Sequence, residues 1–577
     1  MVNGNGISLT DSGSELERQT MPSPVLARQP IRLAAALLGI LAVAWLAGLG
    51  VRGLFAPDEG RYAEIPREML ASGDWVTPRL NGFKYFEKPP LQYWATAAAY
   101  AIFGESTWTA RLWPALTGFA GVLVVSLASI RLWSIRVGML AGLLLGTTAG
   151  YFVAGQFVTL DMGLTFFLTC ALMAFLVAQQ DRTTSTQRKH LMLASWLALG
   201  LAVLSKGLVA LVLPALALVA YAASTRNRAV FTRIHPLAGG ALMLLVAAPW
   251  FIMVQKQNPE FFHFFFIREH FERFATEGHQ RLGAWWYFIP VGLLGTLPWT
   301  FCAIGSLSRS GRLFKRVRGD QFDTERFLLI WVATVFVFFS FSKSKLPGYV
   351  LPAFPALALL AAIELEASPH KYLKYVAPTA IAAGMLWIGA VLLLPHAPGV
   401  AFVMQQAGAG AQWLYAVGAV LIAAGIVMHW LQTRKQTWRA AVAMAVSMLL
   451  VSTLCSLFLR AADTNYSSRQ LVEQLKGDLP PSDKPIPFFS VETFDDSLPF
   501  YLGRTVTLVN FKSELAEGIS AEPEKYLDSL DKFVVVWAGL EAGFAVMTPA
   551  LYDKFSAMGL PMLERARDAR RVLVSRR

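Results

Sequence analysis

The feature that most constrains this chain is a series of apolar runs that recurs along most of its length. Most of these runs are close to the roughly 20 residues that an α-helix needs to cross a bilayer. A soluble fold would have to bury them all, and a chain with 55% hydrophobic and only 15% charged residues has too little polar surface to do so. The sequence therefore predicts a polytopic α-helical membrane protein. The runs lie at approximately 33–51, 91–104, 111–132, 137–154, 162–179, 192–204, 208–223, 236–254, 285–305, 327–342, 348–365, 374–395, 413–431 and 439–460.

Basic residues between the runs predict how the chain is threaded through the membrane. They cluster in short loops, which face the cytoplasm under the positive-inside rule. If every run crossed the bilayer, these loops would fall on both sides. The run at 91–104 is short and follows Pro89 and Pro90, which is typical of an interfacial or re-entrant helix. About thirteen spans then remain, and the basic loops share one side. They are Arg131 and Arg136, 182–189, 226–233, 309–318, Lys371 and Lys374, and 434–439.

The same threading explains the net charge of +13 as a topology signal, so we expect no nucleic-acid partner. It also divides the chain into three parts. We predict a cytoplasmic segment at 1–32, a transmembrane domain at 33–460 with outer loops at 52–110 and 255–284, and a soluble periplasmic domain at 461–577. In this last domain, β-like runs at 485–491, 504–509 and 532–539 and helical stretches at 465–477, 522–530 and 549–558 predict an α/β fold.

The outer loop after the first span is dense in charge. Pro57 followed by Asp58 and Glu59 favours a helix start, because proline tolerates the first turn and carboxylates are stabilised by the positive end of the helix dipole. Residues three and four apart share a helix face, so Asp58, Arg61 and Tyr62 can point the same way. A solvated interfacial helix with intrahelical ion pairs would show the same spacing, so the spacing alone leaves the role of this helix open.

The threading gathers further polar groups on the outer side, where they suit the handling of a lipid phosphate. Cations can hold such a phosphate as it becomes a leaving group, and a carboxylate can orient or deprotonate an acceptor. We assign the catalytic role to Asp58 and Glu59. A lysine here can also be a snorkelling anchor, but the very short loops around Lys206 and Lys345 argue against that alternative. The residues predicted to bind the donor and its phosphate are Arg61, Tyr62, Tyr85, Lys88, Asp161, Lys206, Arg268, Lys345 and Tyr349.

Metal and cofactor sites have weaker support in the sequence. Glu87 and His270 are candidate ligands of a divalent metal such as zinc, but two residues without ligand spacing favour a hydrogen-bonded structural histidine instead. No cofactor is expected to be required, because the sequence has no P-loop, GxGxxG or GxSxG motif in a suitable context. The aromatic run at 261–266 and the residues at 285–287 are predicted to form an interfacial belt rather than a sugar platform.

Four motifs together resemble those of the GT-C glycosyltransferases in the protein O-mannosyltransferase superfamily. Within it they are most similar to the bacterial lipid A 4-amino-4-deoxy-L-arabinose transferases. The resemblance covers the membrane part of the chain, and the combination is far more specific than any single motif. The motifs are PDEGRYAEIPREM at 57–69, FEKPPL at 86–91, GES-W-ARLW at 104–113 and SKSKLPGYVLPAFPALAL at 342–359.

The resemblance implies an inner-membrane enzyme with undecaprenyl phosphate 4-amino-4-deoxy-L-arabinose as donor and lipid A as acceptor, which would give resistance to polymyxin and cationic peptides. It implies a catalytic carboxylate at Asp58 and donor-phosphate contacts at Arg61, Lys88 and Tyr349. A lipid A phosphate is already anionic and needs no general base, so Asp58 either positions a substrate or acts as a base on another acceptor.

We expect the chain to act as a monomer. Two alternatives to the aminoarabinose transferase stay open. One is a GT-C transferase that uses another polyprenyl-phosphate sugar with a protein or glycan acceptor. The other is a lipid flippase or transporter, which the position of the charges at span ends disfavours.

Overall fold

The computed structural model describes residues 38–227, 229–272, 283–308, 321–393, 408–463, 466–475 and 486–576. The chain divides into two compact units, Met1–Ala44 and Trp45–Arg577. The fold and site described below belong to the second unit. The predicted first span at 33–51 lies partly outside the described residues, as does the predicted cytoplasmic segment at 1–32.

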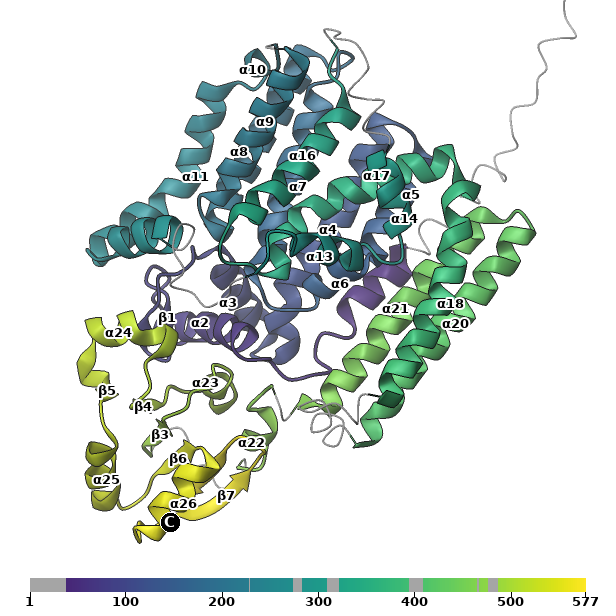
Figure 1. The fold of residues 1–577 in the computed structure, drawn as a ribbon. Coiled ribbons are helices and arrows are strands. Elements are labelled where there is room, and N and C mark those ends of the chain that lie inside the picture. The colour runs from purple at the N-terminus through teal and green to yellow at the C-terminus, as the bar shows by residue number, and fades with distance from the viewer. Residues whose placement is uncertain are drawn as a thin grey trace, which may run out of the picture. The chain divides into compact units, whose positions relative to one another are not determined.

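Helices form most of the second unit, and their order along the chain is shown in Figure 1. The helices up to residue 308 are α2 (Asp58–Ser72), α3 (Leu91–Phe103), α4 (Thr107–Leu132), α5 (Ile135–Thr147), α6 (Ala149–Gly155), α7 (Leu160–Ala178), α8 (Ser185–Lys206), α9 (Val209–Thr225), α10 (Ala229–Thr232), α11 (Pro236–Gln257), the π-helix η1 (His263–Glu272), α13 (Phe288–Gly295) and α14 (Thr300–Ser308). They are followed by α16 (Thr324–Phe341), the 3-10 helix η2 (Pro347–Ala353), α17 (Phe354–Ala367), α18 (Pro369–Leu393), η4 (Gly408–Ala411), α20 (Gln412–Thr433) and α21 (Thr437–Ala461).

The membrane character predicted from the apolar runs is confirmed. Among the described residues, eight helices are long and apolar enough to cross a bilayer: α4, α7, α11, α16, η2 with α17, α18, α20 and α21. Two further helix pairs qualify only if each is one span, because α5 and α6 meet at a 64° bend and α13 and α14 at a 120° bend. The predicted runs at 137–154 and 285–305 are therefore bent rather than straight. The count of thirteen spans stays a prediction.

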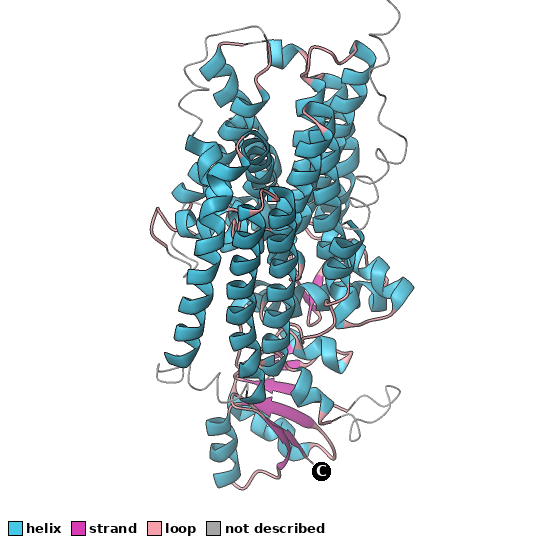
Figure 2. Ribbon diagram, turned by 90° about the vertical axis from the view of Figure 1, so that its right-hand side faces the viewer, coloured by secondary structure: helices cyan, strands magenta, loops and turns pink. Residues whose placement is uncertain are grey.

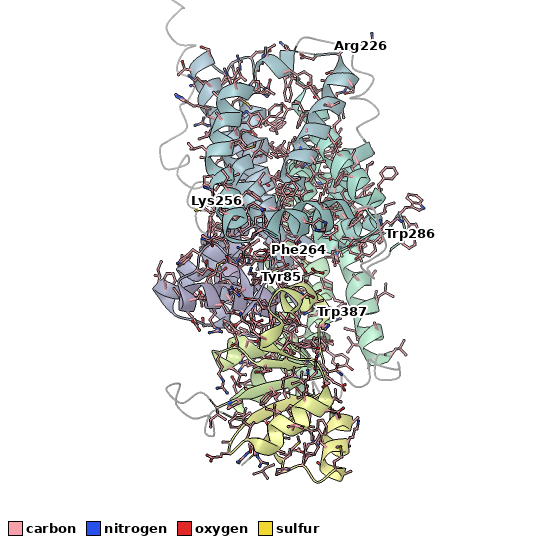
Figure 3. The ribbon with its side chains drawn as sticks, turned by 90° about the vertical axis from the view of Figure 1, so that its left-hand side faces the viewer. Tyr85, Arg226, Lys256, Phe264, Trp286 and Trp387 are labelled. Atoms are coloured by element: carbon pink, nitrogen blue, oxygen red, sulfur yellow. The ribbon has the colours of Figure 1, made fainter. Side chains whose placement is uncertain are left out.

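Contacts between loops confirm that several of the basic loops lie together. The Arg182 guanidinium donates to the Arg131 carbonyl, which joins the α7–α8 and α4–α5 loops. Arg233, just before α11, donates to the Gln179 carbonyl at 3.1 Å. Figure 3 shows Arg226, which belongs to the same group of loops, at the end of the helices that is remote from Tyr85. Among the described residues, the basic loops around Arg131, Arg182 and Arg226 and the predicted site residue Tyr85 therefore lie at opposite ends of the helices.

The loop at 52–110 is folded rather than extended. Its first helix, α2, begins at Asp58 as predicted and is capped at its C-terminal end by Gly73, whose φ of +72° suits glycine. A hairpin of β1 (Arg79–Leu80) and β2 (Phe83–Lys84) follows, and its turn residues Asn81 and Gly82 both have positive φ, as a tight two-residue hairpin requires. The short α3 then packs against α2 and α4. With 13 residues α3 is too short to cross a bilayer, which agrees with the interfacial or re-entrant helix predicted there.

The C-terminal residues form the predicted α/β domain, and Figure 2 shows its strands gathered at one end of the unit. A six-stranded sheet has the order β5-β4-β3-β6-β8-β7, parallel from β5 to β6 and antiparallel at β8 and β7. Its strands are β3 (Phe488–Val491), β4 (Thr507–Val509), β5 (Tyr526–Leu527), β6 (Phe544–Met547), β7 (Leu563–Arg567) and β8 (Val572–Ser575). The helices of the domain are α22 (Arg469–Glu473), α23 (Leu498–Leu502), η6 (Ser513–Leu515), α24 (Ala516–Ala521), η7 (Pro523–Lys525), α25 (Leu530–Gly539) and α26 (Pro549–Ala557).

Two of the element predictions for this domain are wrong. The run at 532–539 was predicted as a strand but belongs to α25. Ser529 caps this helix through the Lys532 N–H, and Phe533 and Trp537, four residues apart on one face, are both fully buried. The stretch at 522–530 was predicted as helical, but only Pro523–Lys525 forms a 3-10 turn, and β5 follows because Tyr526 pairs with Leu508 of β4.

The α/β domain is joined to the loop at 52–110 by hydrogen bonds at several points. Asp463 accepts from the Gly53 N–H at 2.9 and 3.0 Å. Asn81 exchanges two bonds, of 2.8 and 2.7 Å, with the backbone of Val506. Arg79 binds Glu522 at 2.9 Å. These contacts place the domain directly against α2 and the hairpin.

The aromatic run at 261–266 was predicted as part of an interfacial belt, and this prediction is wrong for part of the run. Phe261 and Phe265 are 1% and 0% exposed, and Phe261 packs on Phe86 of the FEKPPL segment with 5.6 Å between the ring centres. The run therefore helps to fix the loop that carries Glu87 and Lys88. Trp285 and Trp286, by contrast, are 72% and 52% exposed, as a belt requires.

Candidate active site

Arg61 lies at the centre of a charged cluster formed by α2, the hairpin loop and the α/β domain. The residue is 2% exposed, and its Nη1 donates to the Tyr85 hydroxyl at 2.8 Å. Glu87 lies 3.8 Å from the same nitrogen, Asp496 lies 3.9 Å from Nε, and Glu514 forms an ion pair with Nη2. One guanidinium therefore faces three carboxylates. Burial disfavours its charge, but Tyr85 and Asp496 outweigh burial and raise the pKa of Arg61 well above its ordinary value.

The two tyrosines predicted for the donor site are part of this cluster. The Arg61 guanidinium carbon lies 5.7 Å from the ring centres of both Tyr62 and Tyr85. Burial raises the pKa of each phenol well above its usual range, so both stay neutral hydrogen-bonding groups. Figure 3 places Tyr85 where the helical part meets the α/β domain.

Asp58 and Glu59 are adjacent in sequence but have different surroundings. Glu59 is 1% exposed, and its oxygens accept from Arg52, from Arg111 at 2.8 and 2.9 Å, and from the N–H groups of Phe55 and Val158, each at 3.1 Å. This arrangement uses the whole carboxylate to tie the start of α2 to α4 and to the loop before α7. These contacts favour a positioning role for Glu59, and the catalytic role assigned from the sequence stays a prediction.

Asp58, at the first position of α2, is partly exposed and lies close enough to Tyr62 to influence its ionisation. Within the part of the chain that the structure describes, its carboxylate has no hydrogen bond or ion pair. Of the two acids assigned to catalysis, Asp58 is the one that is available to a substrate.

A second cluster joins Asp161, Lys206 and Tyr349 from three elements. Lys206, the last residue of α8, forms an ion pair with Asp161 in the first turn of α7, and its Nζ lies 4.9 Å from the ring centre of Tyr349 in η2. Gly348 permits this approach, because a Cβ there would lie 2.8 Å from an Asp161 carboxylate oxygen. The bond between Glu59 and Val158 connects this cluster to α2, since Val158 lies just before α7. The structure thus brings together three predicted residues that are far apart in sequence.

Lys345 and Lys88 both bind backbone carbonyls. The Lys345 ammonium donates to the carbonyls of Ser340 and Ser342 at 2.9 and 2.7 Å, which caps the end of α16. These bonds use two of the three N–H groups of the ammonium. Lys88 donates to the Glu87 carbonyl at 2.8 Å in the loop before α3.

The proposed metal pair cannot be placed in full. Arg268 and His270 belong to the π-helix η1, but their side chains lie outside the described residues. Among the residues that are described, no group of three His, Cys, Asp or Glu side chains is placed to hold a metal ion. Glu87, the other candidate ligand, lies beside Arg61. A metal at Glu87 and His270 stays a prediction.

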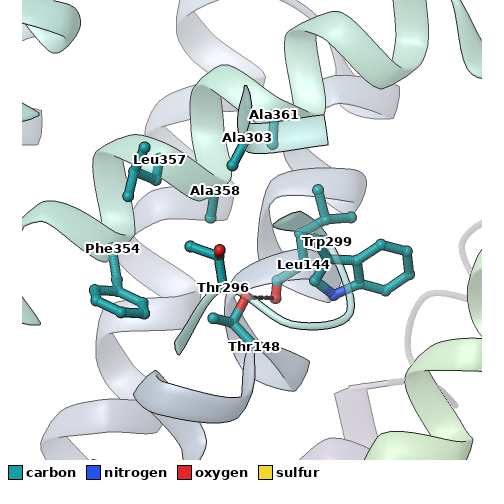
Figure 4. Close-up of a pocket in the computed structure, with 9 residues that line it drawn as sticks. All are labelled: Leu144, Thr148, Thr296, Trp299, Ala303, Phe354, Leu357, Ala358 and Ala361. Carbon is teal, nitrogen blue, oxygen red and sulfur yellow. Dashed lines mark hydrogen bonds between the residues drawn. The ribbon is translucent and has the colours of Figure 1, made fainter. Parts of the chain in front are cut away.

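Figure 4 shows a cavity among the helices, lined by Leu144, Thr148, Thr296, Trp299, Ala303, Phe354, Leu357, Ala358 and Ala361. Its volume, about 10 Å³, is at the lower limit of what one water molecule needs. The two threonine hydroxyls in its wall already donate to helix carbonyls, Thr148 to Leu144 at 2.6 Å and Thr296 to Gly292 at 2.8 Å. This cavity is too small for a sugar or a lipid headgroup, and none of the predicted site residues lines it.

Comparisons with known proteins cover nearly the whole chain and agree with the fold described above. The family profile for the aminoarabinose transferase C-terminal domain matches residues 471–576, and that for dolichyl-phosphate-mannose-protein mannosyltransferase matches residues 31–265. The crystal structure of ArnT from Cupriavidus metallidurans bound to undecaprenyl phosphate is 34% identical, with a TM-score of 0.87 over 95% of this chain and 98% of that one. The chain belongs to the aminoarabinose transferase family.

Relatives within the aminoarabinose transferase family agree with this assignment. The undecaprenyl phosphate-alpha-4-amino-4-deoxy-L-arabinose arabinosyl transferase of Erwinia tasmaniensis is 34% identical over 67% of this chain and 71% of its own length. The transferase of the same name from Aeromonas salmonicida is 38% identical over 55% of this chain. The match spans 57% of the length of that relative.

The aminoarabinose transferase fold also adds residues to the site that the sequence did not reveal. Asp496 and Glu514 come from the α/β domain, and no motif marks them. Gly60 allows the domain to reach α2, because a Cβ there would lie 2.4 Å from the Ser497 nitrogen. Burial, opposed by the charge of Arg61, raises the pKa of Asp496 from 3.8 to about 7. A glycine directly before Arg61 was the one available signal of close approach by another segment.

Proposed function

We propose that the chain transfers 4-amino-4-deoxy-L-arabinose from undecaprenyl phosphate to a lipid A phosphate at the periplasmic face of the bacterial inner membrane. The observation that carries the proposal is the structural match over 98% of an ArnT crystal structure that contains undecaprenyl phosphate. The names of the relatives support the same donor. The resulting cell would resist polymyxin and other cationic peptides, because the added amine reduces the negative charge of lipid A.

In this proposal a lipid A phosphate oxygen attacks the anomeric carbon of the sugar. The bond between that carbon and the phosphate oxygen breaks, and undecaprenyl phosphate leaves with the electron pair. Lys88, Lys206 and Arg268 supply positive charge to the leaving phosphate, and Tyr349 lies against Lys206. Because the acceptor is already anionic, Asp58 positions a substrate and need not remove a proton.

Arg61 has a narrower role than the sequence suggested. Three carboxylates already face it, so a phosphate would have to displace one of them. We infer that Arg61 organises Tyr62, Tyr85 and Glu87 around the sugar. The chain works as a monomer without a required cofactor, and a zinc ion held by Glu87 and His270 would fix the loop before α3 to η1 rather than take part in the transfer.

The test is mass spectrometry of lipid A from cells that make the donor but lack their own aminoarabinose transferase. Cells that express the chain should gain the mass of one aminoarabinose, and cells that express Asp58→Asn should not. Asp528→Asn is the matched control, since Asp528 is an exposed carboxylate of the α/β domain that pairs with the exposed Lys532.

No mass gain with the wild-type chain present in the membrane would refute the proposed donor or acceptor. A gain on a protein or another glycan would favour the alternative GT-C transferase. Near-normal transfer by Asp58→Asn would remove Asp58 from the site.

A further inference from the structure

Three neighbouring residues at the start of α3 bury polar atoms that lack hydrogen-bond partners. Gln92, Tyr93 and Thr96 are 2%, 0% and 0% exposed. Both amide atoms of Gln92 and the hydroxyls of Tyr93 and Thr96 have no partner among the described residues, and they account for four of the fourteen side-chain atoms in that condition. Proteins rarely leave buried polar atoms unpaired, so their concentration in about one helical turn points to a polar ligand.

A second tyrosine on the same helix shows that this concentration is not a general property of α3. Tyr100 follows Tyr93 by seven residues, which places both on one face of the helix. Tyr100 is also buried, at 2% exposed, but its hydroxyl donates to the Ala63 carbonyl of α2 at 3.1 Å. The backbone of α2 therefore satisfies the hydroxyl of Tyr100, whereas the hydroxyl of Tyr93, which is nearer to Lys88 in the sequence, has no partner among the residues that the structure describes.

The position of this turn relates it to the charged cluster. It follows Glu87, Lys88 and the two prolines directly in the chain. The Tyr93 ring lies 6.2 Å from the ring of Tyr62, the residue after Arg61. Burial raises the pKa of the Tyr93 phenol, and Glu87 and Arg61 are the charged groups that act on it. The unpaired atoms are thus next to the groups that we assign to the donor.

We propose that Gln92, Tyr93 and Thr96 bind the sugar of the donor, beside its phosphate; this inference rests on the proposed function. All three side chains are neutral, so they suit hydroxyl and amine groups rather than a phosphate, which selects Lys and Arg. The hydroxyl and amine groups on adjacent sugar carbons donate and accept hydrogen bonds, and a glutamine amide offers an NH2 donor group and a carbonyl acceptor side by side. Binding would pair atoms that the protein alone leaves unpaired.

The test compares two lipids that differ only in the sugar. The full chain in detergent micelles, as wild type and as Gln92→Leu, Tyr93→Phe and Thr96→Val, is assayed for the KM of the undecaprenyl phosphate-linked aminosugar and for the affinity of undecaprenyl phosphate. Each variant should raise the KM of the sugar donor by roughly tenfold, the effect of one lost hydrogen bond in a buried site. The affinity for undecaprenyl phosphate should stay within about twofold of wild type.

Tyr100→Phe is the matched control for Tyr93→Phe. It removes a satisfied hydroxyl, so it should lower the midpoint of thermal unfolding and leave the ratio of the two lipid affinities unchanged. Tyr93→Phe should leave the midpoint of thermal unfolding unchanged and weaken binding of the sugar donor relative to undecaprenyl phosphate. Its hydroxyl makes no hydrogen bond with the described residues, so its removal breaks none of their bonds.

Two outcomes would overturn the inference. If the variants weaken both lipids equally, these residues act on the phosphate or the prenyl chain. If they change neither, internal water satisfies the four atoms. Both conclusions apply only when the wild-type protein transfers the sugar to lipid A. A wild-type protein without this activity would instead refute the proposed function.

Discussion

Replacing Glu59 by glutamine tests whether this residue holds the site together or acts on the substrate. The two carboxylate oxygens accept hydrogen bonds from two buried guanidinium groups, Arg52 and Arg111, and from two backbone N–H groups. Glutamine has almost the same shape, but it removes the negative charge and turns its own N–H groups toward donors. The start of α2 would then keep two buried cations without their counter-ion.

The size of the effect follows from the same contacts. Burial opposes the ionisation of Glu59, but the charges of Arg111 and Arg52 outweigh it and lower its pKa from 4.5 to about 2. The lower pKa corresponds to roughly 3 kcal/mol of stability at neutral pH. Removal of one member of a buried ion pair costs about 3–5 kcal/mol. Because the folded pKa is the lower one, this stability is present above about pH 4.5 and is lost as the pH falls toward 2.

The assay is thermal unfolding of the full chain in detergent micelles, measured beside sugar transfer. Glu59→Gln should unfold at a clearly lower temperature, and its transfer should follow the folded fraction. Asp58→Asn should unfold like wild type and lose transfer. A Glu59→Gln protein with wild-type thermal stability but no transfer would refute the positioning role and return Glu59 to catalysis.

Three further predictions follow from the described contacts. Gly60→Ala should lower the free energy of unfolding by about 1–3 kcal/mol, because the new Cβ would overpack the loop at Ser497. Gly48→Ala is its control and should leave the unfolding midpoint unchanged, because a Cβ there meets nothing within 4 Å. Equal midpoints for the two variants would contradict the close packing at Gly60. Folded protein retains the Asp496 proton up to about pH 7 while the unfolded chain releases it near its ordinary 3.8, so stability should fall as the pH rises from about 4 to 7. Asp496→Asn should flatten that slope in thermal unfolding, and an unchanged slope would exclude Asp496 as its source. Lys206→Gln should lower kcat/KM for the donor at least tenfold, an effect of the size expected for a lost charged contact, and normal kinetics would remove the second cluster from the site.

Much of the membrane part could be predicted because its signals are local. Pro57 and the two acids after it mark the start of α2, and the short run after Pro90 marks α3 as an element that does not cross the bilayer. The grouping of the basic loops follows from charge alone. The gathering of Asp161, Lys206 and Tyr349 follows from the threading, since each lies at a helix end on the same side.

Predictions failed where distant packing overrides a local pattern. The valine-rich run in α25 has strand propensity, but Phe533 and Trp537 gain burial only when a helix places them on one face. The aromatic run at 261–266, which includes the start of η1, resembles a membrane belt, but Phe261 is buried against Phe86, a residue of another loop. In both cases the residues that determine the structure by packing lie far away in the sequence, so a local pattern does not include them.

The carboxylates around Arg61 extend the same reasoning to the site itself. Glu87 precedes α3, whereas Asp496 and Glu514 follow β3 and β4 of a domain whose pattern indicates only an α/β fold. They reach Arg61 because Gly60 has no side chain to hold the domain away, and because the hairpin exchanges backbone bonds with it. The membrane part alone would keep Arg61, Tyr85 and Glu87 but lack two of the three carboxylates. The charge of this cluster is therefore set only when the α/β domain is docked, which is why a site that begins with a recognisable motif is completed by residues that no motif identifies.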